Sequence, residues 1–487
     1  MADVKGKLAA LLQPDNTARL LSFYGQDWYW SEAAVIVKEI ETALQDQQVN
    51  AGVNIALIAR NRPQHAAVIL GMITQNRTVT MVHAYQSSVA MARDISALKI
   101  GVLIVDADDW TTELAVAVRQ NQALAVVLPD SQGASCRVYS DYRQRQDHRC
   151  AGASAGFEVL SSGTTGAPKR TTMPFAVVQR ALDSILAVGP EVAKSADIVS
   201  WPFGTIGGLC QLVTASVLQR PIALLEKFKL DDWLAAVSQY QPKILFVQPA
   251  ILRSLLDADV GKDQLSSIQV ISGGAGPLEP DLQNSFEQRY GIPILWAYGA
   301  TEFCGTIISW TLQLRKEFGL TKMGSTGKPI AGVEVRIIDV DTECVLPVDE
   351  TGWLEARVAT LGNEWVRTTD LAAIDSDGFV FIKGRGDGAI NRGGFKILPE
   401  HVVASLREHP SVLDAAVVGI NDDTLGQVPV AAIELARDCE LSIAEIEHHA
   451  RARLLSYQIP AKWLIVDSLP RTSTMKVLLV DVKKMFE

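Results

Sequence analysis

A loop between residues 160 and 170 contains the residue types that bind phosphate. It reads Leu-Ser-Ser-Gly-Thr-Thr-Gly-Ala-Pro-Lys-Arg and follows a short apolar run, Gly156 to Leu160, which predicts a β-strand. Gly163 and Gly166 let the backbone come close to a ligand, while backbone N–H groups and hydroxyls can face phosphate oxygens. Lys169 adds a compact positive charge. The loop therefore predicts a nucleoside triphosphate ligand, and its hydroxyl-bearing residues are Ser161, Ser162, Thr164 and Thr165.

The same loop departs from the Walker pattern of P-loop nucleotidases. A Walker lysine follows Gly and precedes Ser or Thr, whereas Lys169 lies between Pro168 and Arg170. This argues against a GTPase or an ordinary ATPase. A flexible surface linker would also be rich in Ser, Thr and Gly, but a run that ends in Pro-Lys is not expected of one.

The segment from Trp296 to Glu302, Trp-Ala-Tyr-Gly-Ala-Thr-Glu, places an aromatic ring, a hydroxyl and a carboxylate close together after a β-like run. Mg²⁺ prefers one or two carboxylates together with substrate phosphates. Glu302 is therefore a candidate magnesium ligand. The alternative is a glutamate that only ends a strand.

Three further segments carry charged residues next to turn signals. Asp370, in Arg-Thr-Thr-Asp between two β-like runs, could accept hydrogen bonds from ribose hydroxyls, although an exposed turn aspartate is the commoner explanation. Arg385, in Gly-Arg-Gly-Asp, could reach ribose or phosphate oxygens, and Asp387 lies where a glycine cluster suits a hinge. Lys476 ends a polar turn before the apolar run from Val477 to Val480, where an isolated lysine would merely be a surface residue.

Composition bounds the class of protein. With 487 residues the chain exceeds the roughly 250 to 300 residues at which one core stops growing, so two or more domains are expected. A net charge of −10 argues against a nucleic-acid partner. The six cysteines and seven histidines show no zinc or disulfide spacing. The N-terminus has no signal-peptide pattern and no apolar run nears the ~18 residues of a membrane span, so we expect a cytoplasmic protein without a membrane partner.

The pattern of apolar runs predicts an α/β protein. Up to about residue 325, runs such as Val53 to Ile58, Gly101 to Val105 and Leu124 to Leu128 alternate with helix-like segments, as in parallel sheets covered by helices. Short strands then follow, including Val333 to Ile338, Gly352 to Val358 and Gly378 to Lys383, which indicate a small β-rich subdomain. Beyond Asp387 we predict a compact α+β domain with helices over 399–408 and 442–455 and strands over 413–419, 428–435 and 463–466.

Taken together, these segments resemble the adenylate-forming superfamily, which contains acyl-CoA synthetases, carrier-loading adenylation domains and beetle luciferases. The resemblance runs from about residue 30 to 485 in order and spacing. The matching segments are Ser162–Lys169, Gly273–Ala275, Tyr298–Glu302, Thr369–Asp370, Gly384–Arg385, Ile390–Gly394, His409–Val412, Ala415–Gly419 and Lys476. It implies a large N-terminal domain over residues 1–386, built of two βαβ-type sheets and a small β-barrel-like subdomain, and a mobile α+β lid over 387–487.

The resemblance also implies a reaction in two steps. A carboxylate attacks the α-phosphate of ATP to form an acyl-adenylate, and a thiol then displaces AMP. Lys476 would bridge the carboxylate and the α-phosphate, and Glu302 and Thr165 would bind Mg²⁺. The implied ATP-binding residues are Ser162, Gly163, Thr164, Thr165, Gly166, Lys169, Gly274, Ala275, Tyr298, Gly299, Thr301, Glu302, Asp370, Arg385 and Lys476. The lid would turn about Asp387, and Gly393 and Gly394 would line the tunnel for the thiol arm.

The implied acid pocket is apolar, with Trp201, Phe203, Thr205, Gln248, Gly274, Tyr298 and Cys304 as its candidate lining residues. Relatives that activate amino acids carry an aspartate that holds the substrate ammonium, and no acidic residue occurs between Trp201 and Gln219. A plain aryl or medium-sized acyl carboxylate is therefore favoured. Three departures from the family pattern, Met475, Thr205 and His401 to Val403, bear on the thiol step and on gating of the pocket.

Coenzyme A is the expected acceptor, because the chain ends soon after Lys476 without a fused carrier domain. A free-standing carrier protein would leave the same sequence, so an enzyme that loads a phosphopantetheine arm stays an alternative. A third hypothesis, a catalytically silent nucleotide-binding regulator, is opposed by the intact Lys169, Glu302, Asp370 and Lys476. The sequence thus predicts an AMP-forming acid–thiol ligase that uses ATP, Mg²⁺ and coenzyme A.

Overall fold

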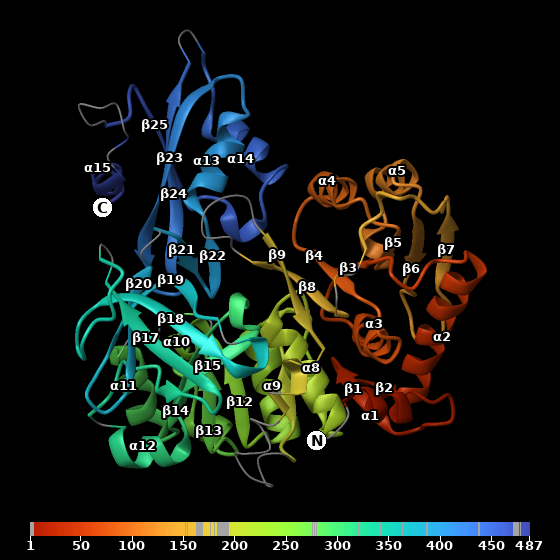
Figure 1. Cartoon of the computed structure of the whole chain (residues 1–487), viewed down its shortest axis with the longest axis horizontal. Helices are drawn as coiled ribbons and strands as arrows, with labels where there is room; N and C mark the ends of the chain where they lie inside the picture. The colour runs from red at the N-terminus through yellow and green to blue at the C-terminus, as the bar shows by residue number, and fades with distance from the viewer. Residues whose placement is uncertain are drawn as a thin grey trace. The chain divides into compact units, whose positions relative to one another are not determined.

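The computed structural model describes residues 4–150, 152, 154–161, 169–175, 177–179, 181–182, 194–274, 276, 278, 280–319, 321–339, 342–362, 364–385, 388–436, 439–470, 477 and 479–487 (Figure 1). The chain forms two compact units. Unit 1 consists of Met1–Leu160, Arg170–Leu245 and Asp263–Gln269, and unit 2 of Ser161–Lys169, Phe246–Lys262 and Val270–Glu487. The domain boundary predicted at Asp387 lies outside the described residues and stays a prediction.

The larger sheet of unit 1 is mainly parallel. From one edge to the other its strands are β7 (Arg137–Ser140), β6 (Leu124–Val127), β5 (Val102–Val105), β3 (Ile55–Ala59), β4 (Val79–His83), β8 (Gly156–Ser161) and β9 (Lys169–Pro174). Strand β3 pairs in parallel with β4 and β5, and every one of its residues is buried. Such continuous apolar strands are typical of a sheet covered on both faces. The predicted strands over 53–58, 101–105, 124–128 and 156–160 agree with β3, β5, β6 and β8.

Helices cover both faces of this sheet. Helices α4 (Ser88–Leu98) and α5 (Thr112–Gln120) pack on one face, and α2 (Trp30–Asp46) and α3 (Pro63–Thr74) on the other (Figure 1). Helix α3 begins at Pro63, and the extended backbone of Arg62 before it is the conformation that a following proline favours. The chain therefore leaves β3 through the three residues Arg60, Asn61 and Arg62 and turns at once into a buried helix.

A second sheet of unit 1 has the strand order β10 (Asp197–Val199), β11 (Ile222–Leu224), β1 (Arg19–Phe23) and β2 (Gln26–Tyr29). Its helices are α1 (Val4–Leu11), α8 (Ile206–Val217) and α9 (Leu230–Tyr240). A buried ion pair joins the start of β10 to Arg220, which lies two residues before β11. Arg220 Nη1 lies 3.0 Å from Asp197 Oδ2, and their side chains are 0% and 2% exposed. Arg220 Nε also donates to the carbonyl of Ser195.

A third sheet has the order β12 (Ile244–Val247), β13 (Val270–Gly273), β14 (Ile294–Ala300), β15 (Gly305–Ser309) and β16 (Lys328–Pro329). Apart from the first two residues of β12, its strands belong to unit 2. Its helices are α10 (Pro249–Asp257), α11 (Pro280–Tyr290) and α12 (Leu312–Phe318). A four-stranded antiparallel sheet follows, formed by β17 (Val333–Ile338), β18 (Gly352–Val358), β19 (Val366–Ile374) and β20 (Val380–Arg385). Strands β17 and β18 coincide with the predicted ranges, which confirms the predicted β-rich region.

The C-terminal part of unit 2 contains the helices and strands that the sequence predicts beyond Asp387. Its sheet has the order β22 (Phe395–Ile397), β21 (Ile390–Arg392), β24 (Gly426–Leu435), β23 (Val412–Asp422), with β25 (Lys462–Val466) beside β24. Alternate residues of β23 face opposite sides. Ala415 and Val417 pack with α13 (Pro399–Arg407) and α14 (Ile443–Arg451), whereas Ala416 and Val418 pack with α15 (Leu479–Lys484). Figure 1 shows α13 and α14 on one side of β23 and α15 on the other.

The mixed α/β architecture with a small C-terminal α+β part confirms the predicted fold class. Within the described part of the chain, no helix has the length and apolar character needed to cross a bilayer.

The ion pair between Arg220 and Asp197 generates a stability prediction. Arg220→Met should lower the free energy of unfolding by about 3 to 5 kcal/mol, because it leaves a buried carboxylate without its partner. Burial already raises the pKa of Asp197, and the charge of Arg220 opposes that rise. Without the arginine the carboxylate takes up a proton more readily. The loss should therefore be smaller at about pH 5 than at about pH 8.

Urea unfolding of the full chain measures this change. Arg289→Met is the matched control, since Arg289 pairs with Asp259, whose side chain is 83% exposed. An exposed pair contributes only about 0 to 1 kcal/mol. Equal losses in the two variants, or a loss at Arg220 that grows as the pH falls, would contradict the prediction.

Candidate active site

Two predicted site residues of unit 2 meet in a buried hydrogen bond. Tyr298 of β14 donates its hydroxyl to Asp370 Oδ2 of β19 over 2.5 Å, and Asp370 is 4% exposed. Burial raises the pKa of Tyr298 well above its usual value, and the neighbouring charge of Asp370 raises that pKa further. The phenol therefore keeps its proton and acts as a donor, which holds the carboxylate in one orientation.

Asp370 lies within strand β19 and is buried, so the alternative of an exposed turn aspartate between two strands is wrong. The sequence Arg-Thr-Thr-Asp contains two β-branched residues, which favour a strand, and this signal outweighed the aspartate. Asp370 stands opposite Arg385 in the antiparallel pairing of β19 and β20, so the backbones of these two predicted ribose-binding residues are adjacent. The side chain of Arg385 is not described.

A residue that the sequence interpretation missed also lies beside Asp370. Lys396 Nζ of β22 is 3.6 Å from Asp370 Oδ2. Its positive charge lowers the cost of burying the Asp370 carboxylate. The available signal was a lysine two positions after the glycine pair, which is too common a pattern to indicate this contact.

Close backbone packing explains the glycines at the ends of β13 and β14. A Cβ on Gly273 would lie 2.3 Å from the Trp296 ring, and one on Gly274 would lie 2.8 Å from the carbonyl oxygen of Ala297. The Trp296 indole donates to the carbonyl of Gly276 at 3.0 Å and is almost fully buried. Trp296 is therefore a core residue that shapes this edge of the sheet. Gly274 is buried at this edge, and its predicted contact with adenine stays a prediction.

Glu302 lies in the short helix η3 (Thr301–Phe303), immediately after β14, and its side chain is exposed. A single accessible carboxylate at a strand end fits Mg²⁺, which takes its remaining ligands from phosphate and water. Cys304 follows in the left-handed region with φ +54° and is buried. Gly299 is required by the close pairing here, since a Cβ on it would lie 2.3 Å from the carbonyl oxygen of Gly305.

Three predicted acid-pocket residues lie in unit 1, on the segment that leads from β10 into α8. Phe203 is fully buried. Thr205 caps α8: its hydroxyl accepts from Gly208 N–H at 3.3 Å and donates to the carbonyl of Pro202 at 2.7 Å. Thr205, which replaces the usual histidine, thus has a local structural role. The Trp201 ring rests on the first turn of α8, where a Cβ on Gly207 would lie 2.3 Å from it.

Gln248, Gly274, Tyr298 and Cys304 belong to unit 2, and Gln248 is the half-buried residue before α10. Because the predicted acid pocket draws on both units, its assembly stays a prediction. The structure describes each half separately.

Gly393 and Gly394 form the two-residue turn of the β21–β22 hairpin, in which Arg392 pairs with Phe395. Their φ angles are +54° and +86°, as a type I′ turn requires. The hairpin is anchored by Arg392, which donates to the carbonyls of Tyr457 and Ile459 at 2.8 and 3.1 Å. The turn geometry alone accounts for both glycines, and their predicted role in the thiol tunnel stays a prediction.

Several predicted site residues lie outside the described residues, namely Ser162, Gly163, Thr164, Thr165, Gly166, Ala275, Asp387 and Lys476. The backbones of Lys169 and Thr301 are described in β9 and η3, but their side chains are not. Their predicted roles in binding ATP, Mg²⁺ and the reacting groups therefore rest on the sequence.

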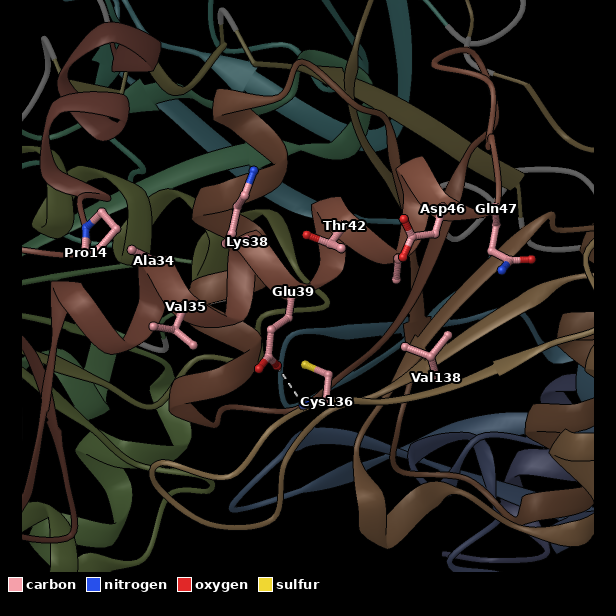
Figure 2. Close-up of a pocket in the computed structure, with 11 residues that line it drawn as sticks. Pro14, Ala34, Val35, Lys38, Glu39, Thr42, Asp46, Gln47, Cys136 and Val138 are labelled. Atoms are coloured by element: carbon pink, nitrogen blue, oxygen red, sulfur yellow. Dashed lines mark hydrogen bonds between the residues drawn. The ribbon is translucent and has the colours of Figure 1, made fainter.

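A surface groove of about 480 Å³ lies elsewhere in unit 1, between α2 and β7 (Figure 2). Glu39 accepts a hydrogen bond there from the backbone N–H of Cys136 at 2.8 Å. Burial, together with the neighbouring Glu39, raises the pKa of the Cys136 thiol to about 12, so it carries no thiolate at neutral pH. None of the residues that line this groove belongs to the predicted site.

Comparison with known proteins identifies the class. Residues 8–362 match the family described as AMP-binding enzyme, and residues 402–476 match the AMP-binding enzyme C-terminal domain. The chain is 27% identical, over 96% of its length and 95% of the relative's, to a 2-succinylbenzoate–CoA ligase of Bacillus pumilus. It is 24% identical, over 93% of its length and 89% of the relative's, to a 4-coumarate–CoA ligase of Pinus taeda.

The fold is shared with a crystal structure of o-succinylbenzoate CoA synthetase from Bacillus subtilis. The TM-score is 0.82 at 24% identity, with 99% of this chain and 98% of that chain covered. The chain belongs to the family of AMP-binding enzymes. The predicted class, an AMP-forming acid–CoA ligase with ATP and coenzyme A as substrates, is confirmed, and Mg²⁺ is the usual requirement of this family.

The buried carboxylate of Asp370 generates a prediction about ATP. Asp370→Asn should raise the KM for ATP by about 10- to 100-fold, because charge-assisted hydrogen bonds to ribose hydroxyls contribute about 1.5 to 3 kcal/mol. The KM for the acid should stay within about twofold. Steady-state pyrophosphate release, with each substrate varied in turn, measures both constants.

Asp375→Asn is the matched control. Asp375 follows the same strand and pairs with Lys322 at 2.8 Å. This variant should leave the KM for ATP unchanged. A similar rise in both variants would show that the effect comes from the stability of the sheet.

Proposed function

We propose that the chain joins an aromatic carboxylic acid to coenzyme A through an acyl-adenylate. The observation that carries this proposal is the likeness over nearly the whole chain to two CoA ligases whose named acids, 2-succinylbenzoate and 4-coumarate, both contain a benzene ring. The candidate pocket segment supports it, since Trp201 and Phe203 are apolar aromatic residues and no carboxylate occurs from Trp201 to Gln219.

In the first proposed step, an oxygen of the acid attacks the α-phosphorus of ATP. The bond from this phosphorus to the bridging oxygen breaks, and pyrophosphate leaves. In the second step, the sulfur of coenzyme A attacks the acyl carbonyl carbon, the bond to the AMP oxygen breaks, and the thiol proton passes to solvent. Neither step needs a covalent bond to the protein, so catalysis consists of positioning and charge stabilisation.

The residues of the chain divide these tasks. Asp370, oriented by Tyr298, accepts from the ribose hydroxyls, and Gly274 offers a flat backbone surface to adenine. Glu302 is the residue that would hold Mg²⁺ together with Thr165, and the ion would neutralise phosphate charge. Lys476 brings a positive charge to the carboxylate and the α-phosphate during the first step.

Coenzyme A is the proposed acceptor, in line with the named relatives. Transfer to the phosphopantetheine arm of a carrier protein uses the same thiol chemistry. It is the alternative that a direct assay separates.

A screen of carboxylic acids tests the proposed substrate class. With ATP, Mg²⁺ and coenzyme A, substituted benzoates and cinnamates should release pyrophosphate and form thioesters, detected by mass spectrometry. The best aromatic acid should exceed a straight-chain fatty acid of similar length by about 100-fold in kcat/KM, the discrimination that a shaped apolar pocket reaches. A preference for fatty acids or amino acids would contradict the proposal. Pyrophosphate release without a CoA thioester would favour a carrier protein as acceptor.

Lys476→Ala should separate the two steps. Loss of its charge should lower adenylation by about 100-fold or more, because the charge stabilises the transition state at phosphorus. Thioester formation from a supplied acyl-adenylate should stay within about threefold of the native rate. The matched control is Lys484→Ala, since Lys484 is an exposed lysine of the nearby helix α15. Equal loss of both steps in Lys476→Ala would reject the proposed role.

A further inference from the structure

The amide of Asn61 makes three hydrogen bonds to the segment that leads into α8 and to the end of β11. Nδ2 donates to the carbonyl oxygens of Trp201 at 2.9 Å and of Leu225 at 3.3 Å, and Oδ1 accepts from Phe203 N–H at 2.9 Å. The side chain is 1% exposed. Both donors and the acceptor of the amide are therefore used, and all three partners are backbone groups.

The loop that carries Asn61 is held rigidly on both sides. Arg60 forms a bidentate pair with Asp109, in which both nitrogen–oxygen distances are 2.6 Å. Arg62 donates to Asp106 at 2.9 Å. Burial alone would raise the pKa of Asp106, but the hydrogen bond from the buried His65 and the charge of Arg62 lower it to about 2. The Asp106 carboxylate is thus ionised at neutral pH and keeps its ion pair with Arg62.

A further carboxylate ties the loop to β11. Glu226, the residue after Leu225, accepts from Arg60 Nη1 and from Arg62 Nη2, each at 3.3 Å. Asn61 therefore lies between two arginines that both bind Glu226, and Glu226 is adjacent to Leu225, one of the hydrogen-bond partners of Asn61. An amide supported in this way cannot move without breaking several ion pairs.

On the other side, the segment from Trp201 to Thr205 has little freedom of its own. Gly207 and Gly208 let it lie directly on α8, since a Cβ on Gly208 would be 2.3 Å from the carbonyl oxygen of Pro202. The hydroxyl of Thr205 closes the turn by donating to that same oxygen. The peptide groups on either side of Pro202 are then held by Asn61.

We propose that Asn61 is a positioning residue that sets the places of the Trp201 and Phe203 rings for the aromatic acid. This inference rests on the proposed function, because the segment is a predicted wall of the acid pocket. Its hydrogen bonds fix the carbonyl of Trp201 and the N–H of Phe203, and a small displacement of a substrate-binding group can cost about 100-fold in rate. Asn61 acts through these backbone groups and does not itself take part in the chemistry.

Two substitutions in the full-length enzyme separate this role from simple filling of space. Asn61→Asp has nearly the same volume and keeps the acceptor for Phe203, but it turns an oxygen toward the carbonyls of Trp201 and Leu225. Asn61→Ala removes all three bonds. We expect each to raise the KM for the best aromatic acid by about 10- to 100-fold, with the KM for ATP within about twofold. Asn61→Asp should be at least as impaired as Asn61→Ala.

Asn121→Ala is the matched control for the loss of a buried amide. Asn121 is a buried asparagine of the same unit and donates to the carbonyl of Ile95 at 2.9 Å. The melting temperature of the Asn121→Ala variant should fall about as much as that of the Asn61→Ala variant, while its KM values for the acid and for ATP stay unchanged. If neither Asn61 variant folds, Asn61→Gln provides the same measurement, since it keeps the amide but displaces it by one methylene group.

Three outcomes would overturn the proposal. The first is an Asn61→Asp enzyme, or an Asn61→Gln enzyme where that variant is the one measured, with native KM values for the acid and for ATP. The second is an equal change in the two KM values. The last is a change in the KM for the acid in Asn121→Ala that is as large as the change at Asn61. If none of the aromatic acids tested supports pyrophosphate release by the native enzyme, the proposed function is rejected, and the role of Asn61 with it. Native activity that the Asn61 variants do not alter would reject the positioning role alone.

Discussion

Charged side chains at the carboxyl ends of buried parallel strands must neutralise one another, and this constraint organises unit 1. Charged residues follow three of these strands within four positions: Arg60 and Arg62 after β3, Asp106 and Asp109 after β5, and Glu226 after β11 of the second sheet. Their ion pairs leave the backbone between the two arginines in one conformation. Ligand sites of α/β proteins form at such edges because loops with free polar groups gather there. Here the charged side chains form ion pairs with one another. The neutral amide of Asn61, between the two arginines, contacts the backbone of the segment that contains Trp201 and Phe203.

Unit 2 handles a buried charge differently. Asp370 lies inside an antiparallel strand, where its carboxylate meets one buried hydroxyl, from Tyr298, and the ammonium of Lys396 at a longer distance. Asp109, in contrast, is held by the bidentate guanidinium of Arg60. The two carboxylates also differ in place: Asp370 belongs to the predicted ATP site, and Asp109 holds the loop that carries Asn61.

Glycines mark the places where backbone groups approach each other, and the reasons differ from site to site. Gly274 and Gly299 allow neighbouring chain segments to come within contact distance, while Gly393 and Gly394 supply the positive φ angles of a hairpin turn. The same composition therefore indicates close approach in one case and a turn in the other. A ligand role is compatible with either geometry but is required by neither.

The sequence alone determined the class of fold, the ranges of several strands, the elements of the C-terminal α+β part and the class of reaction, because these depend on local periodicity and on short motifs whose members are close in the chain. It placed Asp370 between two strands rather than within one, and it passed over Lys396 and Asn61. Only the tertiary structure decided these, since burial, the pairing of β19 with β20 and the contacts of Asn61 with residues about 140 and 164 positions away depend on how distant segments pack. Long-range packing decides which polar groups are buried. A buried polar group needs a hydrogen-bond partner, and that partner can come from any segment that the fold brings next to it.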